Sequence, residues 1–186
     1  MSVYASEQID KIVAIDEAHA QLLTSLVMAR KPNAVLEFGF GTGESCRAIL
    51  RALRFNATPF RYELVDSWSD WSGSPPAEIQ KPEYAEVQFI TSGEQEYVAA
   101  CSTKYQFIFS DADHRNTQRW FDYVYDNILD NEGILIYHDV TNSNMFPNLL
   151  SIYTDTVHKD YHHMLFNYNS RGEERCDRGM LIIFKH

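Results

Sequence analysis

The chain is poor in cysteine, the residue that builds disulfide frameworks and many zinc sites. It has three, Cys46, Cys101 and Cys176, which are widely spaced and form no C-x-x-C pair. An odd number at such spacing argues against a disulfide framework and against a structural zinc site. We therefore expect reduced, mostly buried thiols and a cytoplasmic protein.

Basic residues are also scarce. The chain has 16 lysines and arginines against 26 aspartates and glutamates, which gives a formal net charge of −10. Binding of a nucleic-acid backbone needs a basic face. The charge therefore argues against a nucleic acid as the main partner, although a local basic pocket stays compatible with it.

Long apolar runs are absent. No stretch approaches the roughly 18 apolar residues of a membrane span, and residues 1–30 lack the basic start and apolar run of a signal peptide. There is no internal repeat and no low-complexity tail. The length fits one domain, residues 1–186, with a leading helical segment at 1–33, and it is sufficient for a sizeable core.

One glycine-rich stretch, VLEFGFGTGES at residues 35–45, predicts a short buried strand, a tight loop and the start of a helix reaching Leu53. Gly39, Gly41 and Gly43 would let the backbone approach a ligand closely. The first amides of the helix would face the same ligand. The alternative is a tight strand-to-helix turn that binds nothing.

The other patterns predict strands that alternate with helices. Strands are expected at 60–65, 87–91, 105–110, 134–137, 161–168 and 180–185, and helices at 94–101, 115–130 and 147–158. This alternation favours an open α/β sheet. In the leading segment we interpret Asp16, Glu17 and His19, which interrupt the apolar pattern, as a solvated face.

Asp66 ends the second predicted strand. A carboxylate at this position can accept two hydrogen bonds from a ribose diol, so it supports a nucleoside ligand without naming it. The segment 67–82 that follows is rich in proline and tryptophan. Trp68 could flank an adenine ring, or it could pack on the edge of the sheet.

Four stretches together resemble one family. These are EFGFGTG at 37–43, FRYELVDSW at 60–68, FIFSDADH at 107–114 and GILIYHDV at 133–140. In this order they resemble class I S-adenosylmethionine-dependent methyltransferases, and most of all the small-molecule O-methyltransferases with D-x-D-H and H-D motifs. The resemblance implies a Rossmann-like α/β fold. Its mostly parallel seven-stranded sheet would end in an antiparallel C-terminal strand pair and carry helices on both faces.

The resemblance also assigns residues to the cofactor S-adenosylmethionine. The glycine loop and the acid before it would bind the methionine part, Asp66 the ribose, and the residues after the third strand the adenine. In full, the expected cofactor-binding residues are Glu37, Gly39, Phe40, Gly41, Thr42, Gly43, Asp66, Trp68, Ser92, Gly93 and Asp111.

The resemblance places the residues that act on the substrate at the ends of the fourth and fifth strands. Asp111, His138 and Asp139 are the expected catalytic residues. Asp111 and Asp139 could hold Mg²⁺, with Asn142 or Asp113 completing an oxygen-rich shell. The sequence departs from the catechol-type metal site, which has asparagine directly after the second aspartate.

A second chemistry needs no metal. His138 or His114 could remove the proton of a substrate hydroxyl as a general base, because histidine titrates near neutrality. The alternative for His138 is a structural histidine bonded to backbone at a strand end.

The expected function is therefore O-methylation of a small hydroxyl-bearing molecule. A nucleic-acid amine is an unfavourable substrate, because SDADH stands where amino-methylating enzymes acting on DNA bases carry an N-P-P-Y-like run. An NAD(P)-dependent oxidoreductase is an alternative, although its fingerprint would need a glycine at Glu44. A non-catalytic cofactor-binding subunit is another. The one assembly we consider is a homodimer formed through the leading helix.

Overall fold

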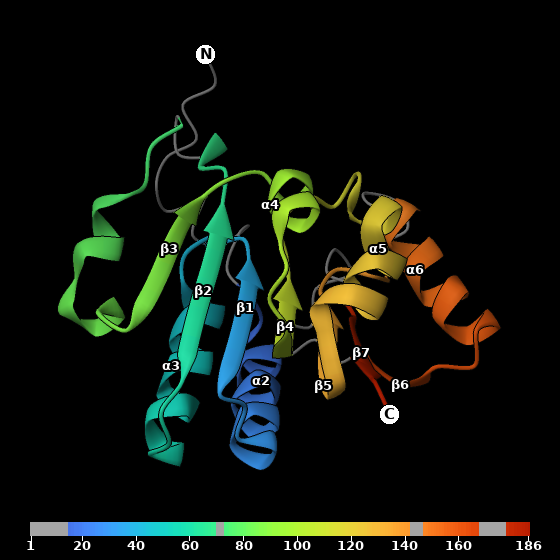
Figure 1. Cartoon of the computed structure of the whole chain (residues 1–186), viewed down its shortest axis with the longest axis horizontal. Coiled ribbons are helices and arrows are strands. Elements are labelled where there is room, and N and C mark those ends of the chain that lie inside the picture. Colours follow the sequence, from blue (N-terminus) through green and yellow to red (C-terminus); the bar gives the residue numbers. More distant parts are fainter. Residues whose placement is uncertain (1–14, 70–72, 142–146, 168–177) are drawn as a thin grey trace.

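The computed structural model describes residues 15–69, 73–141, 147–167 and 178–186. Within these residues seven strands form one sheet in the order β3-β2-β1-β4-β5-β7-β6 (Figure 1). The strands are β1 (Ala34–Phe38), β2 (Arg61–Asp66), β3 (Val87–Thr91), β4 (Tyr105–Ser110), β5 (Leu129–Tyr137), β6 (His162–Phe166) and β7 (Met180–Phe184). The first five pair in parallel, and β7 pairs antiparallel with both β5 and β6. The predicted sheet is confirmed.

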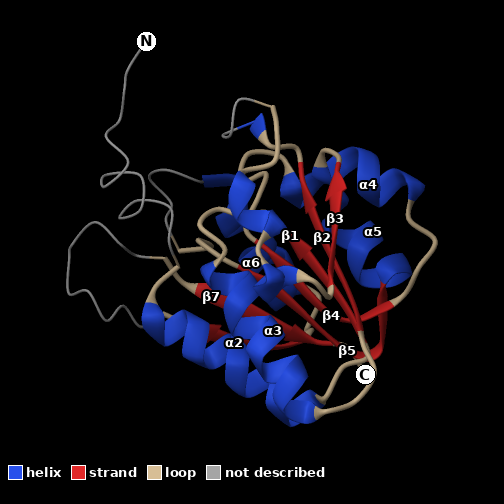
Figure 2. Ribbon diagram, turned by 90° about the vertical axis from the view of Figure 1, so that its left-hand side faces the viewer, coloured by secondary structure: helices blue, strands red, loops and turns tan. Residues whose placement is uncertain are grey.

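Helices cover both faces of this sheet (Figure 2). The longer ones are α2 (Glu17–Arg30), α3 (Glu44–Asn56), α4 (Glu94–Ala100) and α6 (Pro147–His158). Successive strand residues point to opposite faces. In β1, Val35 packs into the core under α2 and α3, whereas Leu36 and Phe38 pack into the core under α4 and α6. The central strands are apolar on both faces because both are covered.

No described helix combines the length and the apolar character needed to cross a membrane. Cys46 and Cys101 are free thiols, as expected, and Cys176 lies outside the described residues.

The helix predicted over 115–130 is confirmed for residues 117–128, although it is shorter and irregular. Three helical segments follow one another there without a break, the 3-10 helix η4 (Thr117–Trp120), α5 (Phe121–Tyr123) and the π-helical η5 (Val124–Ile128). The chain then enters β5 at Leu129. The predicted stop at 131–133 is a bulge inside that strand. Between one ladder pair and the next, β4 advances from Tyr105 to Phe107 while β5 advances from Leu129 to Ile134. Pairing with β4 therefore places Leu129 and Asp130 in the strand instead of at the end of the predicted helix.

The solvated face predicted in the leading segment is wrong for two of its three residues. Glu17 is exposed, but Asp16 and His19 are buried. The Asp16 side chain caps α2 by accepting a hydrogen bond from the amide of Ala18 (2.9 Å). His19 faces the sheet, because with the helix starting at Glu17 it shares a buried stripe with residues four and eight positions on.

A buried carboxylate fixes the segment after β4. Glu94, the first residue of α4, accepts hydrogen bonds from Thr117 Oγ1 (2.6 Å), Trp120 Nε1 (2.8 Å) and the amide of Asp113 (3.2 Å). Burial raises the pKa of Glu94, and these three donors oppose that rise. The side chain therefore joins α4 to the loop between β4 and η4.

We expect Glu94→Ala to lower the free energy of unfolding by about 2–4 kcal/mol, because it leaves several buried donors without an acceptor. Glu94→Gln, which keeps one acceptor oxygen, should lower the free energy of unfolding by less. The exposed Glu78 provides a control, and Glu78→Ala should stay within about 0.5 kcal/mol of the parent. Urea denaturation measures all three, and equal losses for Glu94→Ala and Glu78→Ala would contradict this role.

Candidate active site

The glycine loop turns directly from β1 into α3. Gly39 has φ +92° and Gly43 has φ +77°, a region that L-residues with side chains rarely adopt. A Cβ on Gly39 would lie 2.5 Å from the carbonyl oxygen of Asp111, and one on Gly43 would lie 2.7 Å from Tyr84 Oη and 2.8 Å from the Phe40 ring. The loop therefore packs too tightly for any larger residue at these positions.

Thr42 lies within the same loop and has an unusual side chain. Its Oγ1 is buried and has no hydrogen-bond partner among the described residues. A buried hydroxyl without a partner is costly in a folded protein. Because it sits beside the first turn of α3, it fits a ligand that is held by the loop.

Asp66 ties this loop to the end of β2. Its Oδ2 accepts a hydrogen bond from the amide of Phe40 (2.8 Å), and its Oδ1 accepts one from the amide of Trp68 (2.6 Å). Its carbonyl oxygen accepts a third from the amide of Ser92 (3.1 Å), next to Gly93. The structure thus gathers the cofactor residues predicted from three separate motifs at the carboxyl ends of β1, β2 and β3.

Trp68 is buried completely. Its indole ring lies in the core, with its centroid 6.1 Å from that of Phe40 and 6.3 Å from that of Phe89, and its Nε1 donates to Thr91 Oγ1 (2.9 Å). Of the two interpretations of Trp68, packing against the sheet agrees with this position. An adenine contact by its ring stays an untested prediction.

Glu37 lies beneath the glycine loop, with no exposed surface. It accepts hydrogen bonds from Ser45 Oγ and Tyr62 Oη. Burial raises its pKa from 4.5 to about 8, although the two donors oppose that rise. Near neutral pH Glu37 is therefore largely a protonated carboxyl that supports the loop from below.

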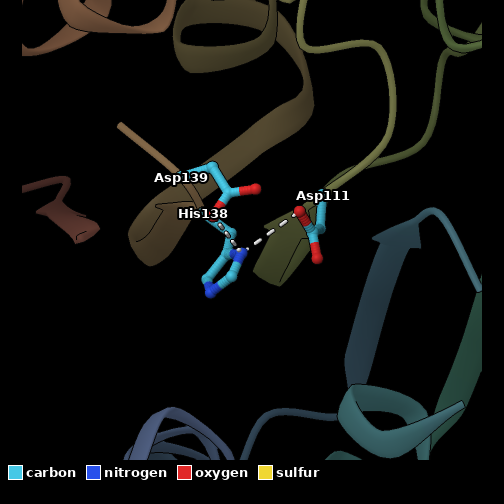
Figure 3. Close-up of side chains that lie close together, drawn as sticks. All are labelled: Asp111, His138 and Asp139. Atoms are coloured by element: carbon cyan, nitrogen blue, oxygen red, sulfur yellow. Dashed lines mark hydrogen bonds and ion pairs between the residues drawn. The ribbon is translucent and has the colours of Figure 1, made fainter. Parts of the chain in front are cut away.

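Three polar side chains converge at the ends of β4 and β5 (Figure 3). His138 Nδ1 lies 3.2 Å from Asp111 Oδ1 and 3.3 Å from Asp139 Oδ1. One ligand atom from each of the three lies within 4.8 Å of the others. The structure therefore brings together the predicted catalytic residues Asp111, His138 and Asp139. Asn142, the predicted third metal ligand, lies outside the described residues.

Two further basic side chains border this group. His114 Nε2 lies 3.4 Å from Asp111 Oδ1 and 3.5 Å from Asp139 Oδ2, and Arg178 Nε lies 3.7 Å from Asp139 Oδ1. Asp113, the other metal ligand considered, instead accepts hydrogen bonds from the side chain of Asn116 and from the amide that follows His114. It therefore caps the turn that follows β4.

The pKa values of Asp111 and Asp139 are shifted in opposite directions. Burial raises the pKa of Asp139. Burial also opposes ionisation of Asp111, but the nearby His138 and His114 lower its pKa overall. For His138, burial disfavours the charge, yet Asp111 and Asp139 raise its pKa. Carboxyls whose pKa values diverge in this way are typical of sites that move protons.

Asp139 also shows backbone strain. Its φ is +61°, in the left-handed region, although it is not glycine. Only 4% of the residue is exposed, and its Oδ1 accepts no hydrogen bond from any described residue. Strained backbone and orphaned polar atoms of this kind cluster at functional sites. The donor set of one imidazole and two carboxylates also fits a divalent metal ion.

His19 completes the group from the leading helix. Its Nδ1 lies 2.8 Å from His138 Nε2, with the two ring planes at 81°. The sequence pattern does not predict this role, because it indicates a solvated face for His19. The signal that could have found it is its spacing of four from Leu23, which is also buried.

A protein-family model covers the central part of this chain. Residues 36–140 match the family model described as a methyltransferase domain. A search of curated proteins found no match to this chain.

Solved structures share the fold at low sequence identity. An O-methyltransferase from Bacillus cereus in complex with SAH has a TM-score of 0.74 and 15% identity, over 99% of this chain and 93% of that one. The O-methyltransferase TomG from Streptomyces achromogenes, involved in tomaymycin synthesis and in complex with SAM, has a TM-score of 0.73 and 14% identity. The match covers 94% of this chain and 82% of that one. An SAH-bound methyltransferase from Podospora anserina has a TM-score of 0.63 and 14% identity, over 95% of this chain and 82% of that one.

The pKa of Glu37 leads to a pH test. Because its folded pKa is raised to about 8, its contribution to stability is complete below pH 4.5 and is lost as the pH rises through 8. Relative to Glu37→Gln, the wild type should therefore lose roughly 2–4 kcal/mol of unfolding free energy between pH 5 and pH 8. Denaturant titrations at several pH values measure this, with the exposed Glu17→Gln as control. Parallel pH profiles for wild type and Glu37→Gln would contradict it.

Proposed function

The chain belongs to the family of methyltransferase domains, and on that premise we propose that it transfers a methyl group from S-adenosylmethionine to a hydroxyl of a small molecule. The observation that carries the proposal is the meeting of two groups of residues. The glycine loop and the Asp111–His138–Asp139 group adjoin where Gly39 packs against the backbone of Asp111. Relatives of the same fold that contain SAM or SAH support it.

The loop at residues 39–43 and Asp66 would hold the cofactor. The free amides at the start of α3 suit a carboxylate, and so does the unpartnered hydroxyl of Thr42. Asp66 stands where a ribose diol would meet a carboxylate. When bound, the cofactor supplies an electrophilic methyl group, so the protein's main task is to align the nucleophile.

The polar group would work on the substrate. Asp111 and Asp139 would orient the hydroxyl and help to accept its proton. His138 is fully buried, and each of its ring nitrogens already lies within hydrogen-bonding distance of a neighbour, which favours an orienting role. His114 keeps 20% of its side chain exposed and faces both carboxylates, so it is the better placed of the two histidines to act as base.

The alternatives receive less support. The matched family is one of methyltransferases, so neither a nicotinamide-dependent oxidoreductase nor a non-catalytic subunit is favoured. With a net charge of −10, a small molecule suits the protein better than a nucleic acid. A cytoplasmic location and a homodimer stay part of the proposal.

S-adenosylhomocysteine should stabilise the protein against heat, and NAD should not. At about 100 times its dissociation constant a ligand adds roughly 2.7 kcal/mol, which should raise the midpoint of unfolding by roughly 5–10 °C in a chain of this size. Differential scanning fluorimetry measures the midpoint with each of the two ligands. A shift with NAD alone would refute the proposed cofactor.

Thr42→Val tests the loop itself. The change keeps the shape and removes the unpartnered hydroxyl, so S-adenosylhomocysteine should bind about tenfold more weakly, the equivalent of about 1.4 kcal/mol. Stability without ligand should not fall, because no described hydrogen bond is lost. Thr154→Val on the exposed face of α6 is the matched control. Unchanged affinity in a calorimetric titration of Thr42→Val would remove this residue from the site.

A further inference from the structure

His19 and His138 form a buried pair of imidazoles. Each has 1% of its surface exposed, and His19 Nδ1 lies 2.8 Å from His138 Nε2. Two facing ring nitrogens at this distance must share one hydrogen, so one donates and the other accepts. The pairing therefore constrains which nitrogen of His138 carries its hydrogen.

If His138 donates from Nε2 to His19, its Nδ1 is left with a lone pair. That lone pair points at the group formed with Asp111 and Asp139 (Figure 3). Histidines that bind metals commonly donate their other N–H to a fixed acceptor, which sets both the tautomer and the ring orientation. In this tautomer His19 Nδ1 is such an acceptor, and it comes from a different element, α2.

The spacing of the three side chains agrees with a shared ion. Two ligand atoms at right angles, each about 2.1 Å from one ion, lie about 3.0 Å apart. His138 Nδ1 lies 3.2 Å from Asp111 Oδ1 and 3.3 Å from Asp139 Oδ1. Asp139 Oδ1 is buried and accepts no hydrogen bond from a described residue. The nearest guanidinium nitrogen, Arg178 Nε, lies 3.7 Å away.

We infer that Asp111, His138 and Asp139 bind a divalent first-row transition ion such as Mn²⁺, and that His19 is the positioning residue that holds His138 as its nitrogen ligand. The inference rests on the proposed function only in that the ion would lie where the hydroxyl substrate is oriented. It differs from the expected all-oxygen Mg²⁺ shell, which stays an untested prediction. An imidazole ligand favours transition ions, whereas Mg²⁺ prefers oxygen ligands and water.

Metal binding can be measured on the purified protein without any methyl transfer. The loss of the electron paramagnetic resonance signal of free Mn²⁺ reports its binding, and competition with Mg²⁺ gives the ratio of the two affinities. We expect Mn²⁺ to bind at least about tenfold more tightly than Mg²⁺. His138→Asn should abolish most of that preference, and Co²⁺ should gain visible absorption bands in the wild type that this variant lacks.

The role of His19 needs a pair of variants of similar size. His19→Asn retains an acceptor near the position of Nδ1, and His19→Leu does not. Removing such an outer hydrogen bond typically weakens metal binding by about 10–100-fold. We expect that loss in His19→Leu and a near-normal Mn²⁺ affinity in His19→Asn. His162, exposed on β6 and paired with His186, is the control, and His162→Ala should bind Mn²⁺ as the wild type does.

Several results would overturn the inference. One is the absence of saturable Mn²⁺ and Co²⁺ binding, which would make the His19–His138–Asp111 chain purely hydrogen-bonded. Another is an unchanged ratio of Mn²⁺ to Mg²⁺ affinity in His138→Asn. A third is an equal loss of Mn²⁺ affinity in His19→Asn and His19→Leu. Methyl transfer without metal binding would refute the inference alone. Mn²⁺ binding without S-adenosylhomocysteine binding would refute the proposed function alone.

Discussion

The site depends on one close approach between two backbones. The amide of Asp111 donates to the carbonyl oxygen of Phe38 (2.9 Å), and the carbonyl oxygen of Asp111 stands 2.5 Å from where a Cβ of Gly39 would be. Only glycine leaves room for this contact. The contact fixes the loop after β1 against the loop after β4, so a cofactor held by the first loop must lie beside the side chains of the second.

The sheet topology places that contact where the strand order reverses. The chain builds β2 and β3 on one side of β1 and then crosses to build β4 and β5 on the other. Ligands of open α/β sheets bind where the strand order reverses, at the carboxyl ends of the strands. The structure divides the chemistry accordingly, with Asp66 and the glycine loop on one side and Asp111, His138 and Asp139 on the other. Buried acids support each half, Glu37 beneath the glycine loop and Glu94 beside the loop after β4.

Local patterns predict much of this arrangement. The strands at 87–91 and 105–110 and the helix at 147–158 have the predicted bounds, because their apolar residues and turn residues agree with the tertiary fold. The three polar residues at the ends of β4 and β5 also meet as predicted, since parallel strands end at the same edge. The bulge in β5 could not be predicted, because it arises from pairing with β4. The spacing of His19 from Leu23 indicates only that His19 is buried. Its contact with His138, 119 residues away in sequence, could not be predicted.

A crystal structure of the protein with S-adenosylhomocysteine tests the central claim most directly. The account predicts the amino-acid part over residues 39–43, the ribose beside Asp66, and the sulfur directed toward the group of Asp111, His138 and Asp139. A ligand bound elsewhere on the sheet, or one whose sulfur is directed away from that group, would contradict it.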